Sequence, residues 1–377
     1  MHDVNCLPVG KLVLSKVFCI IFVFCAATVI ASSGQVLTTV VNFDGSNGTS
    51  PLAPLVRATD GNFHGTTAFG GAGAGTVFKL TPDGTLTTLH TFDNSDGAYP
   101  GRIVQATDGN FYGTTGRNGT GGEGTVFKIT PSGTLTTLHN FCLQMNCPDG
   151  ASPFGGIVQA TDGNFYGTTY TGGLGGLDGY GTVFKITPAG TLTTLYNFCS
   201  QPNCADGSFP DGALVQATDG NFYGTTAEGG TISTCGGVGC GTVFRITASG
   251  TLTTLHGFVG YPTEGTDPSA GLVQATDGNF YGTTYSGGPS NNCPPYFHGC
   301  GTVFTITPSG TVTTLHSFGG SPADGSNPVA VLVQATDGNF YGTTSTGGTS
   351  PCDMGGCGTV FKVTPARAYD TAELRPD

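Results

Sequence analysis

The ten residues ATDGNFYGTT, at positions 106–115, decide the fold of this chain. The same ten letters return at 160–169, 217–226, 275–284 and 335–344. Residues 58–67 repeat them with one change, His64 in place of the tyrosine. The aspartate of the motif recurs at intervals of 48 to 60 residues. A period of that size is typical of propellers and solenoids.

Each unit contains four short segments that have the composition of β-strands. In the second unit they are residues 103–107, 111–115, 124–130 and 134–141. These segments are rich in Val, Ile, Thr, Phe and Tyr, and Gly, Pro, Asn and Asp separate them. We therefore expect four antiparallel strands in each unit, which is the composition of one propeller blade.

The turns between these segments have their own signatures. Residues 108–110 (Asp-Gly-Asn) join the first two segments, and Gly and Asn tolerate the positive φ of a tight hairpin. Residues 131–133 (Pro-Ser-Gly) join the third and fourth. Blades stack face to face, which buries both faces of the inner strands and explains the unbroken apolar segment TVF at 125–127.

The count of segments predicts a closed ring. The word GTVF occurs six times, but a fourth segment follows it only five times. Residues 35–43 (QVLTTVVNF) resemble the fourth segment, so we predict that an N-terminal strand completes the last blade and leaves no exposed edge. An open solenoid would need distinct caps at its ends. We therefore predict an all-β fold, a six-bladed β-propeller of four-stranded antiparallel blades, as a single domain over residues 35–365 with a short tail, residues 366–377.

The N-terminus has the order of a secretory signal peptide: lysines, the apolar residues 17–30, then small residues. We predict that residues 1–31 are the signal and that cleavage follows Ala31. A lipoprotein signal at Cys25 is the alternative, although bulky Phe24 stands before that cysteine where a small residue is wanted. The apolar stretch is shorter than the roughly 20 residues of a membrane span.

The composition narrows the class of protein further. The formal net charge is −12, and a chain this acidic repels phosphate backbones, so we expect no nucleic-acid partner. The 65 glycines stand at fixed places between apolar segments, which favours a turn-rich β fold over low complexity. We predict a secreted, extracellular monomer without a membrane span in the mature chain; attachment to the cell surface is the alternative.

Ten cysteines lie outside the predicted signal, and they form close pairs. The pairs are Cys142/Cys147, Cys199/Cys204, Cys235/Cys240, Cys293/Cys300 and Cys352/Cys357. An even number of cysteines in an exported chain indicates disulfides. A metal site would instead need Cys-x₂-Cys pairs facing each other, whereas the gaps here are longer and no histidine adjoins them.

No residue set with a recognisable catalytic or cofactor-binding pattern is present. One position of the fourth segment holds a histidine in four units: His90, His139, His256 and His316. Equivalent positions of a ring lie far apart, so these side chains cannot form one site. We therefore expect them to be packed residues. The Asp-Gly-Asn turns supply one carboxylate each, fewer than calcium requires. A further repeated acid, as at Asp96 and Asp149, is also interpreted as a turn residue. We predict no cofactor and no metal site.

All the variation between units lies in the second-to-third connections and in the links between blades. Variable loops on a rigid scaffold are where binding usually occurs, so we predict that this face binds a ligand. The candidate contact residues are Tyr170, Asp178, Tyr180, Glu228, Tyr296, Phe297 and His298.

The repeated words TDGNFYGTT and GTVFKITPSGTLTTLH resemble the GloVer tandem repeat of exported bacterial proteins, called choice-of-anchor proteins. The resemblance spans residues 35 to about 365. It implies export and a propeller-like fold, and it assigns no catalytic residue. The chain departs from that pattern at its end, where residues 366–377 contain no hydrophobic anchor.

These observations favour a secreted, non-enzymatic β-propeller that binds an extracellular glycan or a surface protein through its disulfide-stapled loop face. A structural protein of the cell envelope is the second hypothesis. An extracellular hydrolase is the third, because six-bladed propellers include hydrolases, although fold alone does not supply function.

Overall fold

The computed structural model describes residues 38–230, 235–290, 299–319, 324–349 and 357–365. The chain divides into two compact units, Met1–Asn42 and Phe43–Asp377. Only residues 38–42 of the first unit are described, so the predicted signal peptide lies outside the described residues, as does the predicted C-terminal tail. The described residues contain no helix long and apolar enough to cross a membrane.

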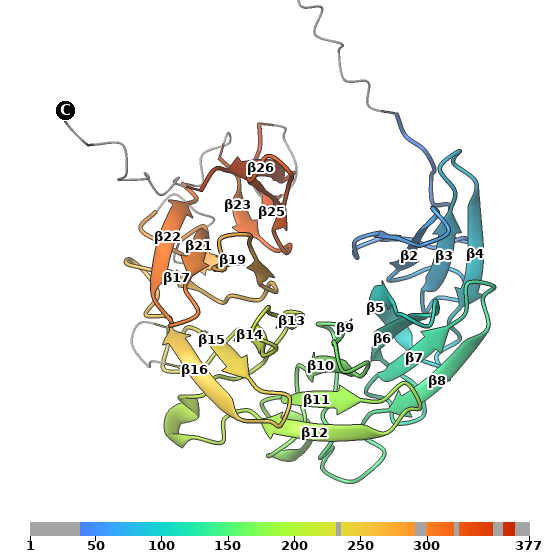
Figure 1. The fold of residues 1–377 in the computed structure, drawn as a ribbon, viewed down its shortest axis with the longest axis horizontal. Coiled ribbons are helices and arrows are strands. Elements are labelled where there is room, and N and C mark those ends of the chain that lie inside the picture. The colour runs from blue at the N-terminus through green and yellow to red at the C-terminus, as the bar shows by residue number, and fades with distance from the viewer. Residues whose placement is uncertain (1–37, 231–234, 291–298, 320–323, 350–356, 366–377) are drawn as a thin grey trace, which may run out of the picture. The chain divides into compact units, whose positions relative to one another are not determined.

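The second unit is an all-β, six-bladed propeller, and its four-stranded antiparallel sheets follow one another around a common centre (Figure 1). The strands of the first three blades are β1 (Val56–Arg57), β2 (Phe63–Thr67), β3 (Thr76–Leu80), β4 (Leu86–Thr91), β5 (Ala98–Gln105), β6 (Phe111–Arg117), β7 (Thr125–Ile129), β8 (Leu135–Asn140), β9 (Ile157–Gln159), β10 (Phe165–Thr169), β11 (Thr182–Ile186) and β12 (Leu192–Asn197).

The strands of the other three blades are β13 (Val215–Gln216), β14 (Phe222–Thr226), β15 (Thr242–Ile246), β16 (Leu252–Gly257), β18 (Val273–Gln274), β19 (Phe280–Thr284), β21 (Thr302–Ile306), β22 (Val312–Ser317), β23 (Ser326–Pro328), β24 (Val333–Gln334), β25 (Phe340–Thr346) and β26 (Thr359–Val363). In the first five blades the four strands pair in chain order. Each of these blades also has a register shift between its third and fourth strands, as at Val126 and Phe127, which the sequence pattern does not reveal.

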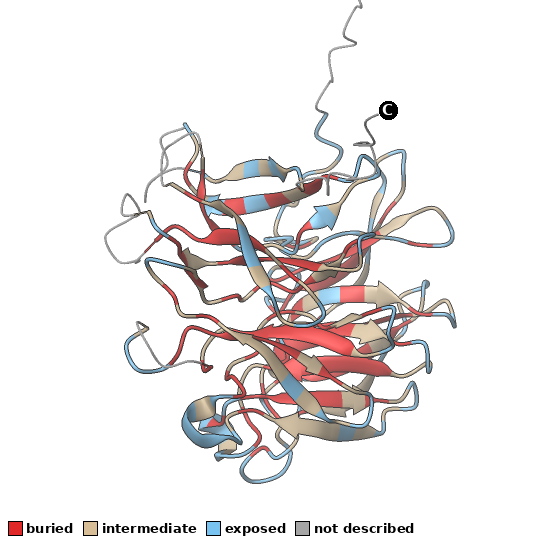
Figure 2. Ribbon diagram, turned by 60° about the vertical axis from the view of Figure 1, so that its left-hand side comes forward, coloured by how far each residue is buried: buried red, intermediate tan, exposed pale blue. Residues whose placement is uncertain are grey.

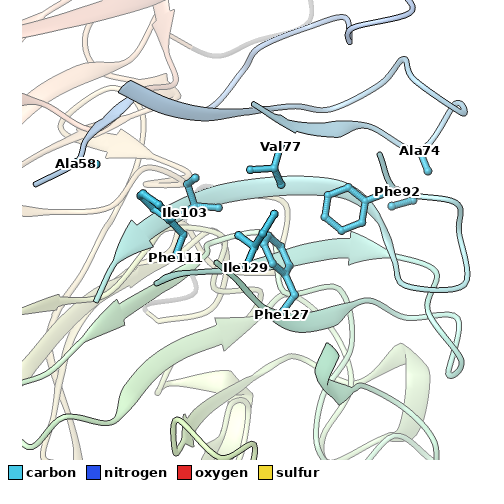
Figure 3. Close-up of a cluster of buried hydrophobic side chains, with 9 residues drawn as sticks. Ala58, Ala74, Val77, Phe92, Ile103, Phe111, Phe127 and Ile129 are labelled. Carbon is cyan, nitrogen blue, oxygen red and sulfur yellow. The ribbon is translucent and has the colours of Figure 1, made fainter. Parts of the chain in front are cut away.

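The core lies between consecutive blades and not within them. Between the first two blades, Val77 and Phe92 of one sheet pack against Ile103, Phe111 and Phe127 of the next (Figure 3). The rings of Phe92 and Phe127 meet edge to face, with centroids 5.3 Å apart. Burial is therefore concentrated in the second and third strands of the first five blades, which are covered on both faces (Figure 2).

The aspartate of the repeated motif organises its own turn. Asp108 accepts hydrogen bonds from the backbone N–H of Asn110 at 3.0 Å, from the side-chain amide of Asn110 at 2.8 Å and from the Tyr112 hydroxyl at 2.8 Å. Lys128 Nζ adds an ion pair at 3.2 Å. Burial raises the pKa of Asp108, but these hydrogen bonds outweigh it and lower the pKa to about 2.

The same motif also makes packing contacts and hydrogen bonds between each blade and the next. The ring of Tyr112 stacks on Phe165 of the following blade, with centroids 4.2 Å apart. The backbone N–H of Thr107 donates to Oε1 of Gln159, also in the following blade, at 2.9 Å. At the other end of the motif, the hydroxyls of Thr115 and Thr125 form a hydrogen bond of 2.9 Å, and both residues are fully buried. The recurrence of the motif follows from this double role in turn and interface.

The structure describes only residues 38–43 of the segment that is predicted to close the last blade. Residues 38–43 form no strand, residues 35–37 lie outside the described residues, and within the described chain β26 pairs with β25 alone. The remaining strand of this sheet, β23, pairs with the far end of β25, as the first residues of β5 pair with the far end of β6. Val360 on β26 is consequently 78% exposed, although its counterpart Val303 is fully buried.

One part of the predicted closure is present. Phe43 packs edge to face on Phe78 with centroids 5.2 Å apart. The fourth-strand phenylalanine of a blade makes the same contact with the next blade, as Phe92 does with Phe127 at 5.3 Å. Phe43 thus occupies the place of a fourth-strand phenylalanine, even though the residues before it are not in a strand.

His64 takes the place of the motif tyrosine in the first blade, and the pattern of contacts is incomplete there. Its ring is fully buried beside Phe111, with centroids 4.2 Å apart, and neither ring nitrogen has a hydrogen-bond partner among the described residues. Burial lowers the pKa of His64. Burial therefore favours the neutral histidine in the folded state, while the unfolded chain takes up a proton below about pH 6.5.

We expect His64→Tyr to stabilise the protein by about 1–2 kcal/mol, or roughly 2–4 °C in melting temperature, because the new hydroxyl reaches Asp60 as Tyr112 reaches Asp108. The gain should be larger at about pH 5.5 than at about pH 7.5, because wild-type stability falls as pH drops through the unfolded pKa of His64. Thermal melts at the two pH values measure this. His64→Phe is the control, and equal stabilisation by both variants would show that the hydroxyl contributes nothing.

Candidate functional site

The long connections of the propeller lie together on one face, which we call the loop face. It consists of the second-to-third loops and the links between blades, because antiparallel strands place the short turns at the opposite end. Backbone pairs join the two kinds of connection, for example Ala151 with Thr171 and Ser208 with Glu228. In the fifth blade the same pairing forms a short ladder between β17 (Gly265–Thr266) and β20 (Ser286–Gly287).

In each link, and in the segment before the first blade, a non-glycine residue in the left-handed region stands immediately before a proline. Their φ values lie between 55° and 58°, at Ser50, Tyr99, Ser152, Phe209, Asp267 and Asn327. Such a conformation costs of order 1–3 kcal/mol, and it persists where the surroundings fix it. At Asp267 the N–H donates to the carbonyl of Cys240 in the preceding blade at 3.1 Å, and the carbonyl accepts from Tyr285 at 2.9 Å. The backbone is thus the same in every link, while the side chain differs.

An aromatic cluster covers part of the loop face at the third and fourth blades. The ring of Tyr170 lies 5.2 Å from Phe209 and 6.3 Å from Phe154, measured between centroids. Phe209 in turn lies 5.6 Å from Tyr180, whose side chain is 40% exposed. These four residues, Phe154, Tyr170, Tyr180 and Phe209, form what we call the aromatic cluster.

A cavity of about 340 Å³ adjoins the aromatic cluster and shares Tyr170 with it. Four loop segments of the fourth blade and its neighbours line it, and the lining residues are Tyr170, Asp211, Ala227, Glu228, Cys235, Val238, Gly239, Cys240, Thr266, Asp267 and Ser269. The disulfide between Cys235 and Cys240 staples one wall. The volume is at the lower end of the range of about 300–1,000 Å³ found for small-molecule sites.

Three carboxylates give this cavity its electrostatic character. Burial raises the pKa of Asp211 to about 6, and the charge of Asp267 adds to the shift. Burial and Asp267 likewise raise the pKa of Glu228, and burial raises that of Asp267 although the Ser269 hydroxyl opposes it. Burial and all three acids raise the pKa of the Tyr170 phenol. The shifts show that negative charge is concentrated without compensation by a neighbouring cation.

The structure places the contact residues that were predicted from the sequence in different parts of the molecule. Tyr170 and Glu228 line the cavity, and Tyr180 belongs to the aromatic cluster. Asp178 is exposed in the short 3₁₀ turn η1 (Gly176–Asp178), away from the cavity lining. The other three predicted contact residues lie outside the described residues: Tyr296, Phe297 and His298.

Sequence reasoning missed Asp211, Asp267 and Phe209. Phe209 and Asp267 precede the proline of a link, and Asp211 follows one, so the repeated X-Pro position was the available signal. That position was interpreted only as a turn. The side chains converge because successive links meet on the same face, which a single sequence does not display.

The cysteine pairs agree with the disulfide prediction where they are described. Disulfides join Cys142 to Cys147, Cys199 to Cys204 and Cys235 to Cys240. Cys300 and Cys357 are also disulfide-bonded, and their predicted partners, Cys293 and Cys352, lie outside the described residues. The bonded cysteines that are described all lie on the loop face.

The repeated histidines and the acids of the links turn out to be partners. His139 Nε2 lies 2.8 Å from Asp149 Oδ2, and His90 Nε2 lies 2.6 Å from Asp96 Oδ2. In the third blade Tyr196 replaces the histidine and donates to Asp206 at 2.8 Å. Each pair ties a fourth strand to the link that follows it, so the role of both residues is structural. No group of three or more His, Cys, Asp and Glu suited to a metal occurs in the described part of the chain.

Fold and loops together define a six-bladed β-propeller repeat protein with disulfide-stapled loops. The chain belongs to the Gloeobacter/Verrucomicrobia repeat family, whose model matches residues 26–238, 142–294 and 232–374. This confirms the resemblance to the GloVer repeat. No curated protein sequence matches the chain.

Two solved structures are similar to the chain at low sequence identity. A catalytically inactive virginiamycin B lyase from Staphylococcus aureus, with quinupristin, is similar with a TM-score of 0.50 and 15% identity, over 76% of this chain and 75% of the lyase chain. The PQQ-bound aldose sugar dehydrogenase from Streptomyces coelicolor has a TM-score of 0.48 and 13% identity, over 87% of this chain and 96% of that chain. These likenesses concern the fold alone.

Asp211→Asn should raise the melting temperature by a few degrees at about pH 7, because it removes a buried charge that Asp267 repels. The folded pKa of Asp211, about 6, lies above its unfolded value of 3.8. The contribution of Asp211 to stability is therefore fully present below about pH 4 and is lost as pH rises through 6. Melting curves from about pH 4 to 7 should show the gain growing with pH. Glu123→Gln, outside the cavity, is the control; a gain independent of pH would contradict the assignment.

Proposed function

We propose that this protein is secreted and binds an extracellular glycan at the cavity and the aromatic cluster of the loop face. The observation that carries the proposal is the position of Tyr170, which belongs to the aromatic cluster and also lines a cavity with three carboxylates. Aromatic rings pack against the apolar face of a sugar, and carboxylates accept hydrogen bonds from its hydroxyls.

The stapled loops support a binding role over a structural one. Disulfides and fixed left-handed residues hold the cavity walls in one conformation, which reduces the entropy lost when a ligand binds. The cavity also concentrates buried charge, which destabilises the fold and serves no structural purpose that the described contacts show. The size of the cavity suits a sugar ring better than a folded partner.

Secretion is supported by two features of the chain. The predicted signal sequence precedes the propeller, and the loops carry disulfides, which persist in oxidising compartments. The net charge of −12 keeps a secreted monomer soluble.

A glycan array probed with the mature protein tests the proposal. We expect a restricted set of glycans to bind, and Tyr180→Ala and Glu228→Gln to weaken binding by roughly tenfold each, because each removes a contact at the loop face. Asn110→Ala and Asn164→Ala alter the turns of the opposite face and should leave binding unchanged. Melting curves confirm that all four variants are folded. Loss of binding only in the asparagine variants would place the site on the wrong face, and an empty array would reject glycan binding.

Hydrolysis of the bound glycan is the second candidate function, and one observation favours it. Asp211 has a pKa of about 6, which burial and the negative charge of Asp267 raise. In glycoside hydrolases, the general acid is a carboxylic acid with a raised pKa that lies beside a second carboxylate. Incubation of the protein with the glycans that it binds, followed by mass analysis, distinguishes the two. Cleavage that disappears in Asp211→Asn would establish the enzyme; intact glycan leaves a binding protein.

A further inference from the structure

We propose that the cavity selects a sugar that carries a free, protonated amine, so that the glycan bound by this protein is an amino-sugar polymer without N-acetyl groups. This inference rests on the proposed glycan-binding function and specifies its ligand. It starts from the cavity and its aromatic wall, which admit one sugar ring, and from the charges that this ring would meet.

The wall of the cavity offers three anions and no cation. None of its lining residues is Lys, Arg or His. Asp267 receives a hydrogen bond from the Ser269 hydroxyl, whereas the carboxylates of Asp211 and Glu228 receive none from the described residues. A neutral ligand would remove water from these groups without replacing their solvation, which is costly.

An ammonium group on the ligand supplies the positive charge and the hydrogen-bond donors that the cavity wall lacks. It donates three hydrogen bonds and carries a compact positive charge, so it can pair with a carboxylate of the wall and donate to neighbouring acceptors. Complementary charge of this kind determines specificity as well as affinity. A hydroxyl in the same position would be uncharged, and an acetamido group would be both uncharged and larger.

Tyr170 distinguishes a sugar amine from a simple cation. Tyr170 lines the cavity together with the three acids, and its ring also belongs to the aromatic cluster, with the Phe209 centroid at 5.2 Å. A pyranose ring can pack against this aromatic surface while its amine reaches the acids. The surface also favours the cation directly through its π face. A lysine-rich peptide has the charge but not the flat ring.

Three β-1,4-linked hexasaccharides that differ only at C2 provide the test: cellohexaose with a hydroxyl, the N-acetylglucosamine hexamer and the glucosamine hexamer. Calorimetric titration into the full mature protein at about pH 6.5 and low salt should show the glucosamine hexamer binding about tenfold more tightly than either of the others. The preference should shrink in high salt, because an ion pair is screened.

The double variant Asp211→Asn, Asp267→Asn should abolish the preference, since it removes two of the three charges. Asparagine tolerates the left-handed conformation at position 267, so the link is retained. Glu123→Gln is the matched control, an acid of the loop face outside the cavity, and it should keep the preference.

The possible results separate this inference from the proposed function. Equal or tighter binding of cellohexaose or of the N-acetylated hexamer overturns the amine inference and leaves glycan binding intact. Absence of binding to all three hexamers also overturns it, and the array then decides whether other glycans bind. Equal binding of hexalysine and the glucosamine hexamer would show that charge alone is recognised and would reject the sugar assignment.

Discussion

Tyr112 joins three parts of the repeat at once. Its hydroxyl holds the aspartate of the hairpin turn, its backbone lies in the second strand, and its ring stacks on Phe165 of the next blade. Tyr166, Tyr223 and Tyr281 make the same stack with the blade that follows each of them. The turn, the second strand and the blade packing therefore meet at one residue, which accounts for the recurrence of the motif from unit to unit.

This arrangement divides the propeller into a constant side and a variable side. Packing and turn contacts that recur in each blade stabilise the inner strands, so the links and second-to-third loops are free to differ. Those loops carry features that cost free energy: left-handed residues such as Phe209 and buried acids such as Asp211. A scaffold stabilised elsewhere can accommodate such local strain at a binding site.

Much of the architecture could be predicted because it repeats. Strand positions, the two kinds of turn and the burial of TVF on both faces follow from local composition and period. The fully buried side chains of Val126 and Phe127 confirm the last of these. The strand predicted at 35–43 is described only in part: residues 35–37 lie outside the described residues, and Phe43 makes the contact with Phe78 that is expected of a fourth-strand phenylalanine.

The candidate site was less predictable, since it depends on contacts across blades. Tyr170 and Glu228 were found as unusual residues in variable loops. Asp211 and Asp267 were not, because they come together only where consecutive links meet. The pairing of His139 with Asp149 was missed for the same reason, although both residues were noticed separately.

The central claim is that the constant side builds the propeller and the loop face binds. Hydrogen exchange of the mature protein, with and without the glycan that binds it most tightly, tests this most directly. The account predicts that the ligand slows exchange in the loops that contain Tyr170, Glu228 and Asp267 and leaves the Asp-Gly-Asn turns unchanged. Protection confined to those turns, with no change in the loops, would contradict it.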